Sequence, residues 1–168
     1  MPHRSQPAGR LSKLREGRVS QAWECYMVTK VFKDRQRLGS DSANAKILLG
    51  SLNHLRATDR IKLFAFCLMP DHLHVAFCLL PGEELSEVVR SFSKFTALQI
   101  NRHRSKSGSV WQEGFHDRHC RDRDELVSLC EYIEHNPVRA GLADVASDWE
   151  FSSASLLGNG MLDREWWP

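Results

Sequence analysis

Two apolar runs separated by three residues constrain the fold of this chain most strongly. Ile61–Leu68 reads IKLFAFCL and His72–Leu79 reads HLHVAFCL, and Met69-Pro70-Asp71 joins them. Short apolar runs of this kind are typical of β-strands, and Pro and Asp favour tight turns. The sequence therefore predicts a β-hairpin, and with it an antiparallel sheet.

The second run begins with two histidines, His72 and His74, that flank a leucine. Residues i and i+2 of a strand point to the same face, so both imidazoles converge on one region of space. Leu73, Val75 and Phe77 then face a core on the other side. This geometry offers two ligands to one metal ion. The spacing alone is equally compatible with two histidines on a solvated sheet face.

The remaining periodicity predicts an alternation of strands and helices. Aromatic and β-branched residues indicate a first strand, a Gly-Ser-Asp-Ser turn precedes an apolar helical stripe, and a second stripe follows the hairpin. A fourth strand and a last helix follow, and the last helix ends near His135 because Pro137 disfavours helical backbone at Asn136. The expected elements are strands at Trp23–Val31, Ile61–Leu68, His72–Leu79 and Phe115–Cys120, and helices at 42–56, 85–102 and 122–135.

This order, β-α-β-β-α-β followed by a helix, predicts an α+β fold of the ferredoxin-like split βαβ type. We expect an antiparallel sheet of four to five strands with helices on one face. The opposite face would stay open for a site.

Composition excludes several classes of protein. No apolar run approaches the length of a membrane span, and the N-terminus lacks the apolar segment of a secretory signal. The five cysteines are scattered and odd in number, which favours reduced thiols over a disulfide framework. Cys67 and Cys78 flank the histidine pair, but their spacing matches no common structural zinc site.

Basic residues are concentrated at the N-terminus. Residues 1–18 hold five basic residues and one acidic residue, although the net charge of the whole chain is only +2. Such an arm indicates an anionic partner, of which nucleic acid is the main candidate, or else a solvated tail. We expect three parts: a basic arm at 1–20, the main domain at 21–142 and a C-terminal extension at 143–168. The candidates for contacts to a nucleic-acid backbone are Arg10, Lys13, Arg15, Arg18, Arg102, Arg104, Lys106 and Arg139.

A second group of polar residues lies at the end of the last predicted helix, in the stretch EYIEHNPVRAGL from Glu131 to Leu142. Tyr132 flanks the apolar stripe of this helix without filling it, and Asn136 lies four residues on, on the same side. A phenol with an amide beside it can therefore face the open side of the sheet. A surface tyrosine followed by an Asn-Pro turn is the ordinary alternative.

These two stretches together resemble one known family. PDHLHV followed by EYIEHNPVRAGL is similar to the REP-associated tyrosine transposases, a branch of the single-tyrosine HUH (His–hydrophobic–His) nucleases. The resemblance covers about residues 22–155 and includes GSVWQ at 108–112 and WEFSS at 149–153. Two places depart from the family pattern: Glu113-Gly114 stands where a basic residue is expected, and the tail from Met161 to Pro168 has no counterpart.

The resemblance implies metal-dependent cleavage and rejoining of single-stranded DNA at hairpin-bearing repetitive palindromic elements. Tyr132 would be the nucleophile that forms a 5′-phosphotyrosine. His72 and His74 would hold a divalent ion, expected to be Mg²⁺ with Mn²⁺ as a substitute. Asn136 matches the position of a third ligand in relatives, and His135 competes for that role. Partners would be single-stranded or hairpin DNA, in a cytoplasmic, nucleoid-associated bacterial protein that is a monomer or homodimer.

Two rival functions remain open on the sequence. One is a domesticated hairpin-binding protein that no longer cuts DNA, and the other is a small ferredoxin-like binding domain with incidental histidines. The first should tend to lose residues of the trio His72, His74 and Tyr132, all of which are present. Trp111 is a further candidate, either to stack on a base or to pack in the core.

Overall fold

The computed structural model describes residues 22–166, and its sheet has the predicted topology. The strands are β1 (Cys25–Val31), β2 (Ile61–Leu68), β3 (His72–Leu79) and β4 (His116–Cys120). They lie in the order β2-β3-β1-β4 and every pairing is antiparallel. The expected α+β fold of ferredoxin-like order is therefore confirmed, with four strands.

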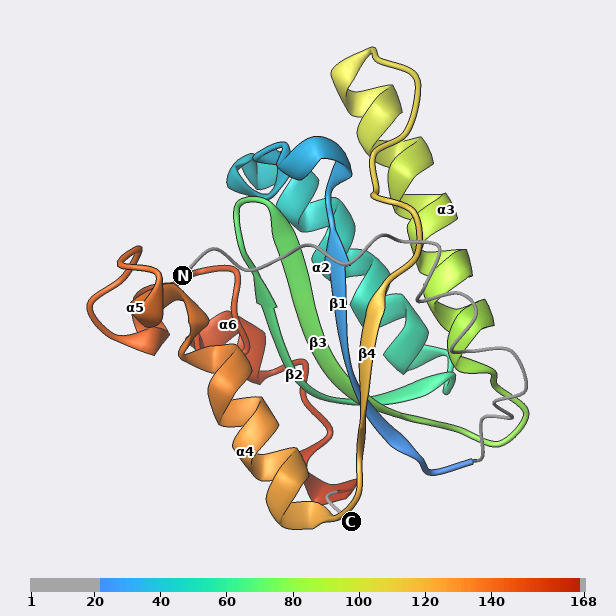
Figure 1. The fold of residues 1–168 in the computed structure, drawn as a ribbon, viewed down its shortest axis with the longest axis vertical. Helices are drawn as coiled ribbons and strands as arrows, with labels where there is room; N and C mark the ends of the chain where they lie inside the picture. Colours follow the sequence, from blue (N-terminus) through green and yellow to red (C-terminus); the bar gives the residue numbers. More distant parts are fainter. Residues whose placement is uncertain (1–21, 167–168) are drawn as a thin grey trace.

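Helices α2 (Ser42–Ala57) and α3 (Leu85–Arg104) pack against one face of this sheet (Figure 1). Asp41 is the N-cap of α2, and its carboxylate accepts hydrogen bonds from the backbone N–H groups of Ala43 and Asn44. The main core between the helices and the sheet includes Leu73, Val75 and Phe77, the residues that alternate with the two histidines. The expected division of β3 into a core face and a histidine face is thus observed.

Helix α4 (Arg123–Glu134) lies on the other face, across the sheet from α2 (Figure 1). Its residues Leu126, Leu129 and Ile133 are buried against β2 and β3 in a second core cluster. The expectation that this face stays open is therefore only partly right. An apolar stripe along α4 covers the β2–β3 side of the face, because such a stripe is stabilised by burial against a sheet.

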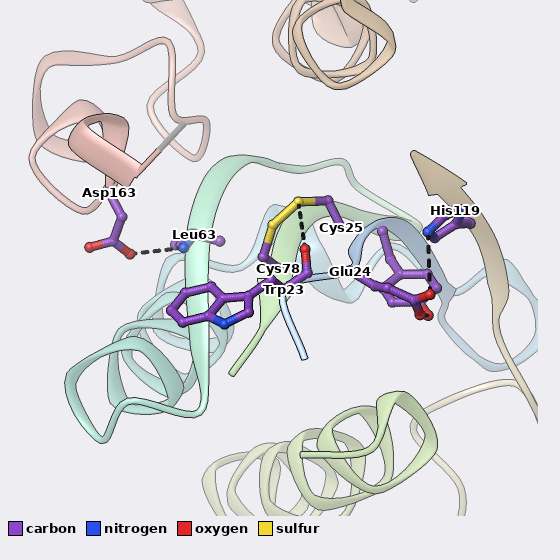
Figure 2. The surroundings of a disulfide bond; sticks show 8 residues. Trp23, Glu24, Cys25, Leu63, Cys78, His119 and Asp163 are labelled. Atoms are coloured by element: carbon purple, nitrogen blue, oxygen red, sulfur yellow. Dashed lines mark hydrogen bonds and ion pairs between the residues drawn. A yellow bond between two sulfur atoms is a disulfide. The ribbon is translucent and has the colours of Figure 1, made fainter. Parts of the chain in front are cut away.

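All five cysteines belong to this second cluster. Cys25 of β1 and Cys78 of β3 are directly paired in the strand register and form a disulfide (Figure 2). Cys67, Cys120 and Cys130 are buried free thiols. The expectation of five reduced cysteines is wrong for this pair, because strand pairing brings together two residues that are far apart in the sequence.

Short elements complete the chain. They are η1 (Lys33–Arg35), η2 (Leu38–Ser40), α5 (Asn136–Arg139), η3 (Ala146–Asp148), α6 (Leu156–Asn159) and η4 (Arg164–Trp166). The segment after η3 runs along the outer edge of β2. The N–H of Leu68 donates to the carbonyl of Phe151 (2.9 Å), and the N–H of Ser153 donates to the carbonyl of Phe66 (2.9 Å). Within the described residues, no helix is both long enough and apolar enough to cross a membrane.

Candidate functional site: a histidine pair facing Tyr132

The turn before His72 is fixed by contact with η2. The N–H of Gly39 donates to the carbonyl of Pro70 (2.9 Å), and the N–H of Phe32 donates to the carbonyl of Asp71 (3.0 Å). A Cβ atom on Gly39 would lie 2.2 Å from the carbonyl oxygen of Met69, so only glycine permits this approach. The start of β3, and with it the first histidine, is therefore held rigidly.

The two imidazoles converge through equivalent atoms. The Nε2 atoms of His72 and His74 are 3.1 Å apart, and the two rings meet edge to face. Each Nδ1 atom points away from this meeting point and contacts a different partner. Two Nε2 atoms aimed at one region are the arrangement that shared coordination of a metal ion requires.

Asp71 orients His72. Its carboxylate contacts His72 Nδ1 at 2.6 Å and accepts a hydrogen bond from the Arg35 guanidinium at 2.8 Å. Burial alone would raise the pKa of Asp71, but the hydrogen bonds from His72 and Arg35 outweigh burial and lower it. Asp71 is therefore a carboxylate at neutral pH, able to accept the Nδ1–H of His72 and leave Nε2 free.

Thr29 of β1 orients His74. Thr29 pairs with His74 in the strand register, and its Oγ1 lies 2.7 Å from His74 Nδ1. His74 is buried, and this burial, together with the charges of His72 and Arg139, lowers its pKa to about 3. The imidazole is therefore neutral at physiological pH, which is the form that binds a metal ion.

Tyr132, near the C-terminal end of α4, lies beside the histidine pair. Its ring centroid is 6.1 Å from that of His74, and its side chain remains 42% exposed. The guanidinium of Arg139, from α5, lies over the ring of the phenol, 3.8 Å from its centroid. The structure thus brings His72, His74, Tyr132 and Arg139 together on one face of the sheet.

The candidates for a third ligand differ in their surroundings. Asn136 is half-buried at the start of α5, and its Nδ2 has no hydrogen-bond partner within residues 22–166. His135 is exposed, and its Nδ1 contacts the carbonyl of Glu131 at 2.9 Å. The described part of the chain contains no group of three His, Cys, Asp or Glu side chains that could hold a metal, so His135 does not complete the pair here. The two converging Nε2 atoms fit a divalent ion. Asn136 would add its side-chain carbonyl oxygen Oδ1, because the Nδ2 group is a hydrogen-bond donor and cannot coordinate a cation.

The other candidates for DNA contacts lie apart from this site. Arg102 and Arg104 are at the C-terminal end of α3 and Lys106 follows it, where the helix extends beyond the sheet (Figure 1). Arg10, Lys13, Arg15 and Arg18 lie outside the described residues.

Trp111 belongs to the core. It is 6% exposed and stacks on Phe32, with ring centroids 4.4 Å apart, while its Nε1 donates to Thr96. The core alternative for Trp111 is therefore correct, and stacking on a base is not available to this side chain.

No sequence pattern indicates Thr29, because its contact with His74 depends on strand register. For Asp71 the sequence predicts only a role in the turn. Its position next to the first histidine is the one signal that would have identified it, since a carboxylate commonly orients a metal-binding imidazole.

Comparison with known proteins identifies the class. Residues 22–136 match the model of the family described as "Transposase IS200 like", and this chain belongs to that family of transposases. A curated protein of Haemophilus influenzae assigned to the REP-associated tyrosine transposases is 31% identical over 99 residues, which is 53% of this chain and 56% of that protein. The REP-associated tyrosine transposase of Escherichia coli is 24% identical over 108 residues, covering 61% of this chain and 60% of that protein.

A solved structure of a REP-associated tyrosine transposase bound to a REP hairpin has the same fold. It superposes with a TM-score of 0.67 at 22% identity, over 81% of this chain and 79% of the other. At the level of sequence, the chain spans only 56% and 60% of the lengths of the two curated relatives that it matches.

Proposed function

We propose that this protein cleaves and rejoins single-stranded DNA at hairpin-bearing elements through a covalent bond to Tyr132. One observation carries the proposal: the Tyr132 ring lies 6.1 Å from His74, on the sheet face where both Nε2 atoms converge. Membership in a transposase family agrees with this chemistry. The hairpin that accompanies the structurally similar transposase supports hairpin DNA as the partner.

In the proposed reaction, the Oη atom of Tyr132 attacks a backbone phosphorus and loses its proton. The P–O3′ bond breaks, the departing O3′ takes up a proton, and a 5′-phosphotyrosine forms. Because the phosphodiester bond is exchanged and not hydrolysed, a free 3′-hydroxyl can reverse the step.

A divalent ion held by His72, His74 and the side-chain amide of Asn136 would stabilise negative charge on the phosphate, and Mg²⁺ or Mn²⁺ suits such a site. Arg139 contributes a fixed positive charge beside the phenol. Arg102, Arg104, Lys106 and the basic residues of the N-terminal arm would contact the DNA backbone away from the site.

The two tyrosines of this chain provide a matched test. The protein is incubated with a labelled single-stranded hairpin and Mn²⁺, and a denaturing gel then reveals any covalent adduct. Tyr132→Phe should abolish the adduct while hairpin binding persists. Tyr26→Phe should retain the adduct, because Tyr26 is buried in the main core. His72→Ala should lose cleavage and ion binding together.

An adduct that survives in Tyr132→Phe would show that another residue is the nucleophile. Hairpin binding without any adduct in the unaltered protein would instead favour the hairpin-binding function without cleavage.

A further inference from the structure

An open pocket of about 300 Å³ lies on the side of Tyr132 that faces β1 and β4. Thr29 and Met27 of β1, Leu129 and Tyr132 of α4 and His116 of β4 line it. Tyr132 therefore lies between two features, the histidine pair and this pocket. The proposed function uses only the first of them.

Strand register places His116 in line with the histidine pair. Thr29 is paired with His74 on one side and with His116 on the other. Directly paired residues of antiparallel strands point to the same face, so all three side chains project toward α4. With neighbouring strands about 4.8 Å apart, His116 lies roughly 10 Å from His74, with Thr29 between them.

The lining of the pocket suits a nucleobase better than a phosphate. Met27 and Leu129 supply apolar surface. Arg118 also lines the pocket, but it donates two hydrogen bonds to the Glu125 carboxylate, at 2.5 and 3.0 Å. The guanidinium of Arg118 is thus held against Glu125, a carboxylate that it shares with Arg121. The exposed imidazole of His116, in contrast, can stack on a base or hydrogen-bond to its edge.

We infer that this pocket holds the base of the nucleotide that remains attached to Tyr132, and that His116 contacts this base. The inference rests on the proposed function. In that reaction O3′ departs from the side of the phosphorus opposite Tyr132, and the retained nucleotide stays covalently bonded to Tyr132 through its 5′-phosphate. The neighbouring pocket is the space available to its base.

The inference is tested by pairing a base deletion with a side-chain deletion. The rate of adduct formation is measured with Mn²⁺ for a hairpin substrate that is intact, abasic at the retained nucleotide, or abasic at the departing nucleotide. With the substrate below saturation, loss of a binding contact between a base and an aromatic side chain lowers the rate by about tenfold. In the unaltered protein, removing the retained base should therefore slow the reaction about tenfold.

His116→Ala should slow the reaction with the intact substrate by a similar factor and should be insensitive to loss of the retained base. The two effects would then be coupled and not multiplicative. The departing base should show no such coupling.

His119→Ala is the matched control, since His119 is an exposed histidine on the same strand that projects to the other face. There it contacts Tyr26 and lies 3.8 Å from Glu24 (Figure 2). In His119→Ala, removing the retained base should slow adduct formation as much as it does in the unaltered protein. His116→Gln, which can still hydrogen-bond, guards against a folding defect, and circular dichroism should show both His116 variants to be folded.

Multiplicative effects of His116→Ala and the abasic substitution would overturn the inference while leaving the proposed function intact. Absence of any adduct with the unaltered protein would overturn both.

Discussion

Each imidazole of the histidine pair uses its two ring nitrogens for different purposes. One nitrogen of each ring is occupied by Asp71 or Thr29, and the other is directed at the second ring. Burial of His74 keeps that ring neutral, because a charged imidazole would lose its hydration. At the residue scale, Asp71 and Thr29 therefore orient the two rings so that both Nε2 atoms point to one shared position.

Replacing Thr29 with Val tests this organisation. Val has nearly the same shape but cannot hydrogen-bond to His74 Nδ1, so the ring loses its orientation. We expect Mn²⁺ affinity to fall by about tenfold or more, as titration monitored by electron paramagnetic resonance would reveal. Thr58→Val is the control, since the Thr58 hydroxyl bonds to the His54 carbonyl at the end of α2. Equal affinities in Thr29→Val and the unaltered protein would contradict the assigned role.

At the scale of single elements, α4 is fixed at its N-terminus by reciprocal hydrogen bonds. Asp122 accepts from the N–H of Glu125, and the Glu125 carboxylate accepts from the N–H of Arg121. This backbone bond, together with the guanidinium groups of Arg121 and Arg118, lowers the pKa of Glu125 to about 2. The helix that carries Tyr132 thus begins at a defined residue.

The lowered pKa predicts how stability depends on pH. Since the folded-state pKa of Glu125 is below its ordinary value of 4.5, its stabilisation is present above pH 4.5 and is lost as the pH falls toward 2. Glu125→Gln should therefore lower the Tm at pH 7, and the difference from the unaltered protein should shrink over that range. Thermal denaturation followed by circular dichroism measures both. Glu131→Gln, at an exposed position on the same helix, should change the Tm little at pH 7; a constant Tm difference for Glu125→Gln at all pH values would refute the prediction.

Local sequence signals predicted these elements well. Apolar periodicity predicted the hairpin with its observed bounds, and α4 ends at Glu134, next to the expected end near His135. The reason given for that end was wrong, because Asn136 is helical and begins α5, where Pro137 occupies the first turn. Contacts that depend on strand register could not be predicted from local sequence, because β1 pairs with strands that are more than 40 residues away in the chain. Three features depend on strand register in this way: the contact of Thr29 with His74, the pairing of Thr29 with His116, and the pairing of Cys25 with Cys78.

The disulfide between β1 and β3 predicts the number of thiols that react before and after reduction. In denaturant without reductant, three thiols should react with a chromogenic disulfide reagent, and five should react after reduction. Cys25→Ser should raise the unreduced count to four by freeing Cys78, whereas Cys120→Ser should lower it to two. Because the bond closes a separation of 53 residues, reduction should lower the free energy of unfolding by about 4 kcal/mol. Five reactive thiols in unreduced protein would argue against the bond.

At the scale of the whole molecule, the C-terminal segment connects both cores to the edge of β2. Asp163 is buried, and its carboxylate accepts from the N–H of Leu63 (2.8 Å; Figure 2) and from the guanidinium of Arg56 (2.9 Å). Ser153 joins the same edge to α4 by donating to the Glu134 carboxylate (2.8 Å). The sequence alone left the contacts of this extension open, since it contains no strand pattern.

Asp163→Ala should destabilise the protein as a whole. The buried N–H of Leu63 would lose its acceptor and Arg56 its partner, so we expect the free energy of unfolding to fall by about 1–3 kcal/mol. Urea denaturation at neutral pH measures the change. Glu165→Ala, an exposed position in the same segment, should have little effect, and an unaltered urea midpoint for Asp163→Ala would contradict the expectation.

The C-terminal segment that pairs with the edge of β2 also determines how far the chain can be shortened. A protein ending at Leu142, where the tyrosine motif stops, would keep every residue of the proposed site. It would also leave the N–H groups of Leu63, Phe66 and Leu68 facing solvent along one apolar edge strand. Unpaired strands of this kind recruit further chains. Such a truncated protein should aggregate when produced, although it retains all residues of the proposed site.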